Sequence, residues 1–510
     1  MRNLTRFLLL SFWLAGGVAG LSRGAWAQAA GAKPSVEERM AALEQRFERL
    51  EQRLDAVLER LASGEAEEDV SGLAMLRPMA AVERKLQMVE SRARQGELVA
   101  AKSVASKRDT VMANDAPKGI LAGAGREGFF LRSEDGGFAL KLRGTIQADG
   151  RFLAGAAPRG GSTFSASKVR PTLEGVLFKN FGFKFMPDFG GGTTVIQEAY
   201  FEAAIRPWLK LRAGKMKGPV GLERLVADTD VEFFERALPT NLAPNRDVGV
   251  ELYGEPWGGV ASYAAGIFNG VADGSSGDFD SDNRREFEGR WLLRPFRKNG
   301  AAAMREFGVG IAGSYGRKSG DALSSEVAAY KTTGQQSFFR YRNDGTTAGT
   351  AVADGEHYRW SPQANYYAGP VGLWGEYALS RQQVRRGALR AQIGNAAWQA
   401  GGTIVLTGEK ASYYGVTPAR AFEGGQGSWG AFEIAARYSE LRADREAFPW
   451  FADPQNAVQT ARAWALGLNW YLNRNVKLLL NYERTTFEQA AGGANRKAEN
   501  AVVERFQVAF

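Results

Sequence analysis

The chain has 510 residues, including 62 glycines and 11% aromatic residues, and it contains no cysteine. The glycine and aromatic content favours many strands and tight turns over a helical domain, and the lack of cysteine excludes disulfides and thiolate metal or redox chemistry. The formal net charge of +9 indicates a preference for anions without specifying nucleic acid.

The N-terminus has the pattern of a secretory signal. Arg2 and Arg6 precede an apolar run at 7–21, and the small-residue sequence Ala25-Trp26-Ala27 follows. Such a segment is removed on export, so the sequence predicts cleavage before Gln28. The alternative is a membrane anchor, but the 15 apolar residues of the run fall short of the roughly 20 that a spanning helix needs.

A helical region is expected after the signal. Over residues 40–61 the apolar positions alternate steps of three and four, with Glu and Arg between them, as in the seam of a coiled coil. A weaker copy follows at 82–89. A lone amphipathic helix packed on a domain would show the same period, so that alternative stays open. No clear period runs through 101–127, which we interpret as a linker.

From 138 to the end there are sixteen candidate strands, most about ten residues long, and many carry a two-faced pattern. In 138–152, "FALKLRGTIQADGRF", the even positions are apolar or glycine and the odd ones are mostly polar or charged. Short connectors such as Lys179-Asn180 alternate with long ones such as 316–355, as they do between the two rims of a transmembrane barrel. We therefore predict an all-β fold, a sixteen-stranded antiparallel β-barrel after a short periplasmic α-helical coiled coil.

The predicted barrel sits in the outer membrane of a Gram-negative cell, in contact with its lipid bilayer. Phe138, Leu140 and Leu142 are expected to face lipid, since lysine or arginine there would cost about 2–4 kcal/mol at mid-bilayer. The chain ends in Phe510, as the last strand of such a barrel typically does, although Glu504 interrupts the apolar face of this strand. The expected organisation is a signal peptide at 1–27, a coiled-coil region at 28–100, a linker at 101–127 and a barrel at 128–510.

The lumenal face of the first five strands is predicted to be cationic. Alternate residues of a strand point to opposite faces, and by this parity the lumenal face carries eight lysines and arginines and five carboxylates. Basic residues in a narrow aqueous pore select anions by focusing the field, whereas solvated charges in a general pore would leave the same pattern. The candidate anion-binding, pore-lining residues are Lys141, Arg143, Lys168, Arg170, Lys184, Asp188, Arg212, Lys215 and Lys217. Asp188 is included because a carboxylate accepts a hydrogen bond from protonated phosphate and repels sulfate.

Six stretches of the sequence resemble the phosphate-selective porin O/P family. The resemblance covers about 370 residues and implies a trimeric outer-membrane channel that passes phosphate or polyphosphate along a track of arginines and lysines. Where an Arg-Arg pair is expected, this chain has Ser167-Lys168, and lysine lacks the bidentate fork of arginine. The stretches are "KVRPTLEG" (168–175), "FKFMPDFGGG" (183–192), "RAGKMKGPVGLERL" (212–225), "ERALPTNLAPNRDVGVEL" (235–252), "WQAGGTIVLTGEK" (398–410) and "WGAFEIAARYSEL" (429–441).

A long connector follows the fifth predicted strand, at 218–246. In a sixteen-stranded porin this is the third external loop, which folds into the barrel and sets the constriction. The Phe233-Phe234 pair is expected to pack against the inner wall, and charged residues are expected to line or brace the narrowest part. The candidate constriction residues are Glu223, Arg224, Phe233, Phe234, Glu235, Arg236 and Arg246.

Enzyme and metal-site interpretations find little support. The single histidine, His357, has no Cys or His companion and is expected to be a solvated residue at the rim. The acidic run 277–289 imitates a calcium loop but has Asn283 and Gly289 where glycine and glutamate are needed, so a charged external loop is expected. We predict no catalytic residue, no metal, no cofactor and no nucleic-acid partner.

The sequence thus predicts a passive anion channel for phosphate or polyphosphate, assembled as a homotrimer. Two alternatives stay open. One is a general anion pore. The other is a structural outer-membrane anchor whose coiled coil binds a cell-wall or periplasmic partner, and the sequence does not identify that partner.

Overall fold

The computed structural model describes residues 119–125, 128–155, 162–280, 282–424 and 427–510. The predicted signal peptide and coiled-coil region lie outside these residues. Within them, no helix combines the length and the apolar content needed to cross a membrane.

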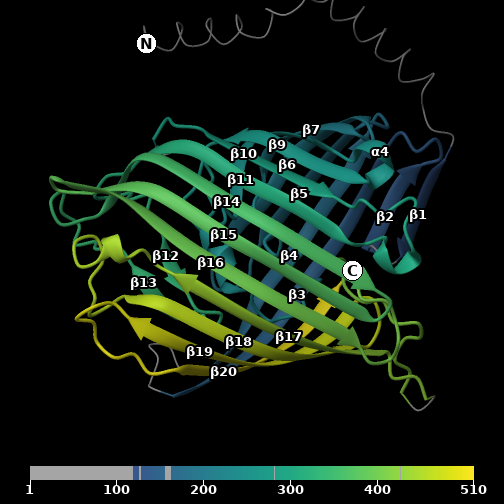
Figure 1. Ribbon diagram of the computed structural model, residues 1–510. Coiled ribbons are helices and arrows are strands. Elements are labelled where there is room, and N and C mark those ends of the chain that lie inside the picture. Colours follow the sequence, from purple (N-terminus) through teal and green to yellow (C-terminus); the bar gives the residue numbers. More distant parts are fainter. Residues whose placement is uncertain (1–118, 126–127, 156–161, 281, 425–426) are drawn as a thin grey trace, which may run out of the picture. The chain divides into compact units, whose positions relative to one another are not determined.

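Sixteen antiparallel strands form a closed barrel (Figure 1). Each strand pairs with the next one in the barrel, and the last strand pairs with the first, so the barrel itself has no open edge. The predicted sixteen-stranded antiparallel barrel is confirmed. Its strands are β3 (Ala139–Gly155), β4 (Thr163–Leu177), β5 (Phe181–Asp188), β6 (Val195–Arg206), β7 (Leu209–Lys217), β8 (Arg246–Gly254), β9 (Ala261–Phe268), β10 (Glu286–Leu293), β11 (Gly308–Ser319), β14 (Val352–Ala368), β15 (Val371–Arg386), β16 (Leu389–Val405), β17 (Ala431–Arg442), β18 (Val458–Tyr471), β19 (Val476–Gln489) and β20 (Glu499–Ala509).

A small hairpin extends the sheet beside the barrel. Strands β1 (Ile120–Gly125) and β2 (Gly128–Ser133) pair with each other, and β2 pairs with positions 139–142 of β3, whereas β20 pairs with positions 145–155 of β3. Strand β1 therefore lies where a linker was expected. Its sequence, ILAGAG, is apolar or glycine at every position, so it shows no alternation of polar and apolar residues that would predict a strand. The strand is defined by its pairing with β2.

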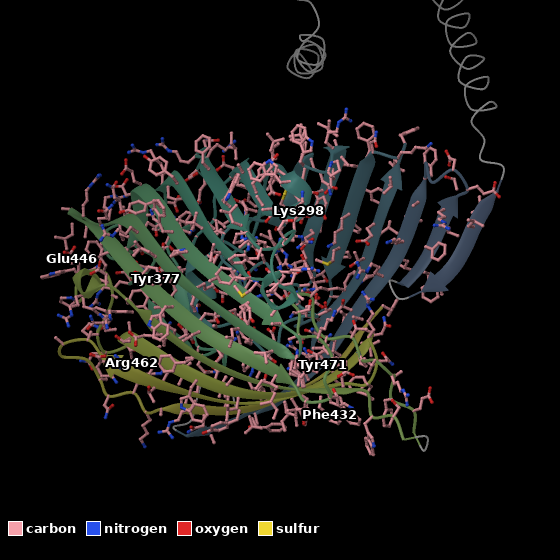
Figure 2. The ribbon with its side chains drawn as sticks, turned by 45° about the vertical axis from the view of Figure 1, so that its right-hand side comes forward. Lys298, Tyr377, Phe432, Glu446, Arg462 and Tyr471 are labelled. Atoms are coloured by element: carbon pink, nitrogen blue, oxygen red, sulfur yellow. The ribbon has the colours of Figure 1, made fainter. Side chains whose placement is uncertain are left out.

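The two faces of each barrel strand meet different surroundings. On β3, Leu142 and Ile146 are 47% and 49% exposed on the outside, while Gln147 and Asp149 are buried inside. Aromatic side chains also gather outside. Phe432, which Figure 2 labels near one rim, stacks on Trp470, and Trp429 packs on the same tryptophan. An apolar outer face with aromatic side chains near the rim suits a lipid environment.

The connections differ between the two rims. The rim that holds the C-terminus, here the C-terminal rim, has short turns such as 178–180 and 369–370. The opposite loop rim has long connections such as 269–285 and 320–351. Some connections depart from this rule, and two do so most clearly. The connection at 406–430 is long and lies at the C-terminal rim, and β15 and β16 are joined at the loop rim by two residues, where Gly387 supplies the positive φ of 57° that a tight hairpin needs.

Loop-rim connections fold into the barrel and fill part of it. The connection 320–351 contains the hairpin β12 (Ala329–Lys331) and β13 (Ser337–Arg340), whose aromatic residues pack on the 3-10 helix η2 (Leu238–Leu242) and on the inner faces of β15–β18. This apolar plug leaves the other side of the barrel, toward β3–β10, for polar groups. The remaining short helices are α4 (Pro256–Gly259), η3 (Ala302–Met304) and η4 (Arg445–Ala447).

Candidate functional site

The connection 218–245, here the inward loop, is fastened to the wall formed by β15–β20. The Glu223 carboxylate accepts hydrogen bonds from Arg437 Nη1 at 2.8 Å, from Gln399 Nε2 at 3.0 Å and from the Ala237 N–H at 2.7 Å. The N–H of Leu222 donates to Glu376 Oε2 at 2.7 Å. The loop is therefore held by buried, charge-assisted hydrogen bonds, which are the stronger kind.

Phe233 and Phe234 add an apolar anchor on the same wall. Phe233 packs with Leu222 and Trp374, and Phe234 packs in a separate cluster on β19 and β20. The guanidinium carbons of Arg437 and Arg505 lie 4.3 and 4.4 Å from the ring centres of Phe233 and Phe234, as in cation–π contacts. These contacts leave the opposite side of the loop facing β4–β10.

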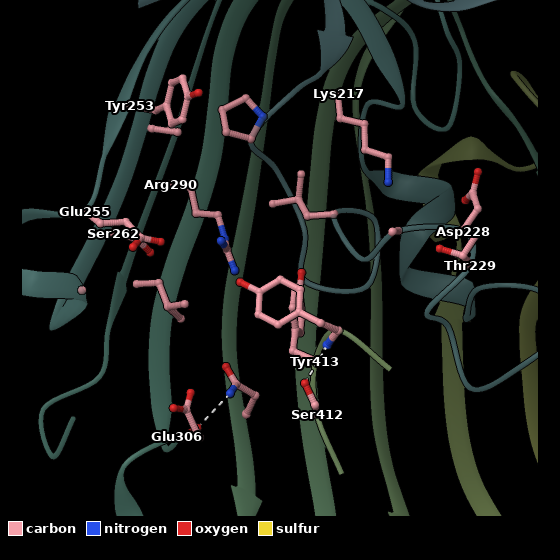
Figure 3. Close-up of a pocket in the computed structure, with 18 of the residues that line it drawn as sticks. Lys217, Asp228, Thr229, Tyr253, Glu255, Ser262, Arg290, Glu306, Ser412 and Tyr413 are labelled. Carbon is pink, nitrogen blue, oxygen red and sulfur yellow. Dashed lines mark hydrogen bonds between the residues drawn. The ribbon is translucent and has the colours of Figure 1, made fainter. Parts of the chain in front are cut away.

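A cavity of about 1560 Å³ lies between the inward loop and that opposite wall (Figure 3). It extends from turns of the C-terminal rim to the loop, and its lining carries twelve lysines and arginines against six carboxylates. The local field therefore favours anions. The basic lining residues are Arg143, Arg170, Lys184, Lys210, Arg212, Lys217, Arg246, Arg290, Arg294, Arg297, Arg305 and Lys410.

Asp228 of the inward loop lies where cations from several elements meet. Arg236 Nη2 is 2.6 Å from its Oδ1, and Arg170 Nη1 donates to its Oδ2. Lys168 and Arg246 approach Oδ2 at 3.8 and 3.9 Å. Burial alone would raise the pKa of Asp228, but the surrounding cations hold this pKa well below the ordinary 3.8. Asp228 is therefore a fixed negative charge at the cationic wall.

Two further carboxylates on the barrel wall share these cations. Asp188 on β5 accepts from Arg170 Nε at 2.6 Å and from two backbone N–H groups, and it does not line the cavity. Glu198 on β6 pairs with Lys184 at 2.9 Å and with Arg246 at 3.5 Å. The wall is thus cationic in sum, with most of its charges paired.

The remaining candidate pore residues occupy different surroundings. Arg212 lies between the rings of Tyr200 and Tyr253, with its guanidinium carbon 4.5 and 4.4 Å from their centres, and it pairs with Glu202 at 3.0 Å. Lys217 donates to the Val226 carbonyl at 2.9 Å. These contacts position Arg212 and Lys217 at the cavity lining.

Three candidates lie toward the ends of strands. Arg143 lines the cavity and pairs with Glu174 at 3.4 Å, and Lys141 stands opposite Glu174 in the β3–β4 register. Lys215 is buried, pairs with Asp278 of the 269–285 connection at 2.5 Å and does not line the cavity.

The charged constriction candidates mainly brace the loop itself. Arg224 donates to the Thr240 carbonyl at 2.5 Å, and the Glu235 carbonyl accepts from Arg437 at 3.0 Å. Arg236 donates to the carbonyls of Glu223 at 2.9 Å and Val226 at 2.7 Å, besides pairing with Asp228. Arg246, expected in the loop, is the first residue of β8.

Some site residues were not among the sequence candidates. Asp228 is one, because only the path of the loop brings this carboxylate to β4 and β8. A second group lies near the C-terminal rim, where the connection 294–307 supplies Arg294, Arg297 and Arg305. The basic composition of the stretch 294–305 was the available signal for that group.

Two expectations at the loop rim were wrong. His357 is fully buried, with Nε2 2.9 Å from Ser380 Oγ and 3.4 Å from Asp273, because the 269–285 connection folds over β14. The acidic run is only in part a loop, since Glu286 and Glu288 lie on β10 with their side chains buried. In the described part of the chain, no group of three or more His, Cys, Asp or Glu residues is arranged to hold a metal ion.

Comparison with known proteins assigns the chain to a family. The model of the family described as "Phosphate-selective porin O and P" matches residues 140–510. The chain belongs to this family. This porin is 22% identical to Porin O of Pseudomonas aeruginosa over 409 residues, which cover 75% of this chain and 91% of that protein. The predicted family, the predicted anion-porin class and the predicted location in the Gram-negative outer membrane are confirmed.

Solved porin structures resemble the barrel. An anion-selective porin from Comamonas acidovorans is 12% identical with a TM-score of 0.45, over 73% of this chain and 100% of that chain. The DcaP channel of Acinetobacter baumannii is 11% identical with a TM-score of 0.46, over 74% of this chain and 99% of that chain.

Proposed function

We propose that this porin is a passive channel for phosphate-class oxyanions, without a catalytic role, and that the wall formed by β4–β10 selects them. The observation that carries the proposal is the cavity beside the inward loop, with twelve basic residues against six acidic ones in its lining. An anion that enters such a cavity loses contacts with water and gains contacts with positively charged donors. The low-dielectric walls strengthen the attraction between the anion and these donors.

Arginine side chains give this wall its preference for oxyanions over chloride. A guanidinium presents parallel N–H groups that fit two oxygens of phosphate, whereas chloride offers no such pair. Arg170 and Arg246 are the central arginines, and Lys184 adds a point charge. Lys168 beside Arg170 supplies positive charge but lacks the parallel N–H donors of a guanidinium. We therefore expect phosphate to bind more tightly than chloride, with modest discrimination among oxyanions.

A general anion pore is the second candidate function. The ion pairs between basic side chains and carboxylates on the wall favour it. Lys184, Arg212 and Arg170 each have a carboxylate within about 3 Å. Paired cations attract a passing anion less than unpaired ones. The two functions differ in whether phosphate at low concentration blocks the chloride current.

We also propose that the porin assembles as a homotrimer, because its outer face carries a charged residue in an apolar groove. Glu504 lies in the middle of β20 and points outward, into an apolar groove that also involves Phe164, Leu468 and Phe506. An ionised carboxylate facing lipid is unfavourable, and a neighbouring subunit would cover it. A role for the N-terminal region in binding a cell-wall or periplasmic partner stays a hypothesis.

Single-channel recording of Lys184→Gln tests the proposed function. We expect phosphate to block the chloride current of the wild type, and we expect the half-blocking concentration to rise about threefold to tenfold in the variant, as loss of about 0.7–1.4 kcal/mol predicts. Lys179→Gln is the matched control, because Lys179 lies in an exposed turn outside the cavity. An equal response of both variants, or no phosphate block in the wild type, would favour the general pore.

A further inference from the structure

The carboxylate of Asp228 holds the position that a bound oxyanion would take. Its two oxygens are approached by Arg170 and Lys168 from β4, by Arg246 from β8 and by Arg236 from the inward loop. These donors converge on it from the wall and from the loop. The Asp228 side chain is only 8% exposed, yet it contributes to the cavity lining.

We propose that Asp228 is a tethered competitor, and that a phosphate-class oxyanion binds at the cationic wall by displacing the Asp228 side chain from it. This inference rests on the proposed function and adds a residue that sets how tightly the site holds its ligand. The ligand is defined by its chemistry, a tetrahedral oxyanion with one or two negative charges.

The local charge explains how Asp228 competes with an anion. Four cations approach its carboxylate, namely Lys168, Arg170, Arg236 and Arg246. Removing the Asp228 charge raises the formal charge of this cluster by one unit. Without Asp228 the site would hold a dianion tightly, and a channel must release its ion as well as bind it.

The loop allows such a displacement without unfolding. The backbone carbonyl of Asp228 accepts from Gln147 Nε2 at 3.2 Å, and that of Thr229 accepts from Gln507 Nε2 at 3.0 Å. Arg236 keeps its own hydrogen bonds to loop carbonyls. The main chain therefore stays in place while the Asp228 side chain rotates, which is a fast movement of a single group.

The cations on the barrel wall around the site also have carboxylate partners that belong to the wall itself. Asp188 accepts two backbone N–H groups in addition to Arg170, and Glu198 bridges Lys184 and Arg246. In the described part of the chain, no backbone N–H donates to the carboxylate of Asp228 or of Glu198, so both are held by cations alone. Glu198 belongs to the barrel wall, whereas Asp228 reaches the cations from the inward loop, so Asp228 is the carboxylate that we expect an anion to replace.

Phosphate block of the chloride current in Asp228→Asn tests the proposal, with Asp321→Asn as the control. Asp321 is exposed in the 320–351 connection and does not line the cavity, so its variant removes one carboxylate outside the proposed site. We expect the half-blocking phosphate concentration to fall about tenfold in D228N, with longer block events, and to change less than about twofold in D321N.

Asp228→Glu and Asp228→Ser complete the series. D228E keeps a competing carboxylate, so its half-blocking phosphate concentration should stay close to that of the wild type. D228S should behave like D228N, and the use of two neutral variants guards against poor folding of one of them. Weaker or unchanged phosphate block in both neutral variants would overturn the proposal and make Asp228 a structural brace. A wild type that phosphate does not block would instead refute the proposed function, so the two failures are distinguishable.

Discussion

Asp228 and Arg170 show how single side chains set the character of the cationic wall. Arg170 bridges Asp188 on the barrel and Asp228 on the loop, so it ties the loop to the wall and also carries charge for an anion. Removing one partner of a buried pair leaves the other uncompensated, at a cost of about 3–5 kcal/mol. We therefore expect the same residues to affect both stability and conduction.

The ionisation of Asp228 predicts a pH dependence of stability. Because nearby cations lower the folded-state pKa of this carboxyl below 3.8, its stabilising contribution is complete above pH about 4 and is lost as the pH falls through the lower folded pKa. We expect the midpoint of thermal unfolding of D228N to lie below that of the wild type at neutral pH. The difference should shrink in strong acid.

Circular dichroism of the detergent-solubilised barrel at neutral and strongly acidic pH checks this. Asp321→Asn serves as the control, since Asp321 lies in an exposed connection. A difference between D228N and the wild type that stays constant down to strong acid would contradict the assigned ionisation.

At the scale of elements, the inward loop is the part that we propose makes the barrel a selective channel. Its apolar anchors, Phe233 and Phe234, are almost fully buried. Replacing a buried phenylalanine by alanine costs about 3–5 kcal/mol. Since these rings hold the loop against β15–β20, their loss should free the loop from that wall.

We expect the double variant Phe233→Ala/Phe234→Ala to show larger and noisier single-channel conductance and weaker anion preference. Phe279→Ala, in an exposed part of the 269–285 connection, should leave both quantities unchanged. An unaltered conductance in the double variant would mean that the polar anchors at Glu223 suffice to hold the loop.

Element positions followed well from the sequence, because alternation with a period of two reports directly which side of a strand meets lipid. Parity assigned Lys168, Arg170 and Lys184 to the inside, where they lie near the loop. Parity does not account for Lys215 and Lys217, which stand three and five residues from Arg212. Lys217 lines the cavity, whereas Lys215 does not.

Contacts made by loops could not be predicted in the same way. The burial of His357 and the position of Asp228 depend on how long connections fold over the barrel, and local sequence carries no period that encodes such a path. The hairpin partner of β1 is another case, because its sequence is apolar on both faces. These features arise from tertiary packing.

At the scale of the whole molecule, the outer face predicts assembly. If a neighbouring subunit covers Glu504, then Glu504→Arg should destabilise the trimer, whereas Glu504→Leu should preserve it. Electrophoresis of unheated samples separates trimer from monomer. Equal trimer stability of both variants would place Glu504 outside the subunit interface, and Glu440→Arg, near the loop rim, provides the control.

The central claim is that the cationic wall beside the inward loop makes this porin anion-selective. The zero-current potential of the wild-type channel, measured across a planar bilayer in a tenfold gradient of potassium chloride, tests it most directly. The account predicts a potential whose sign and size approach the chloride equilibrium value. A potential near zero, or one with the sign of potassium selectivity, would contradict it.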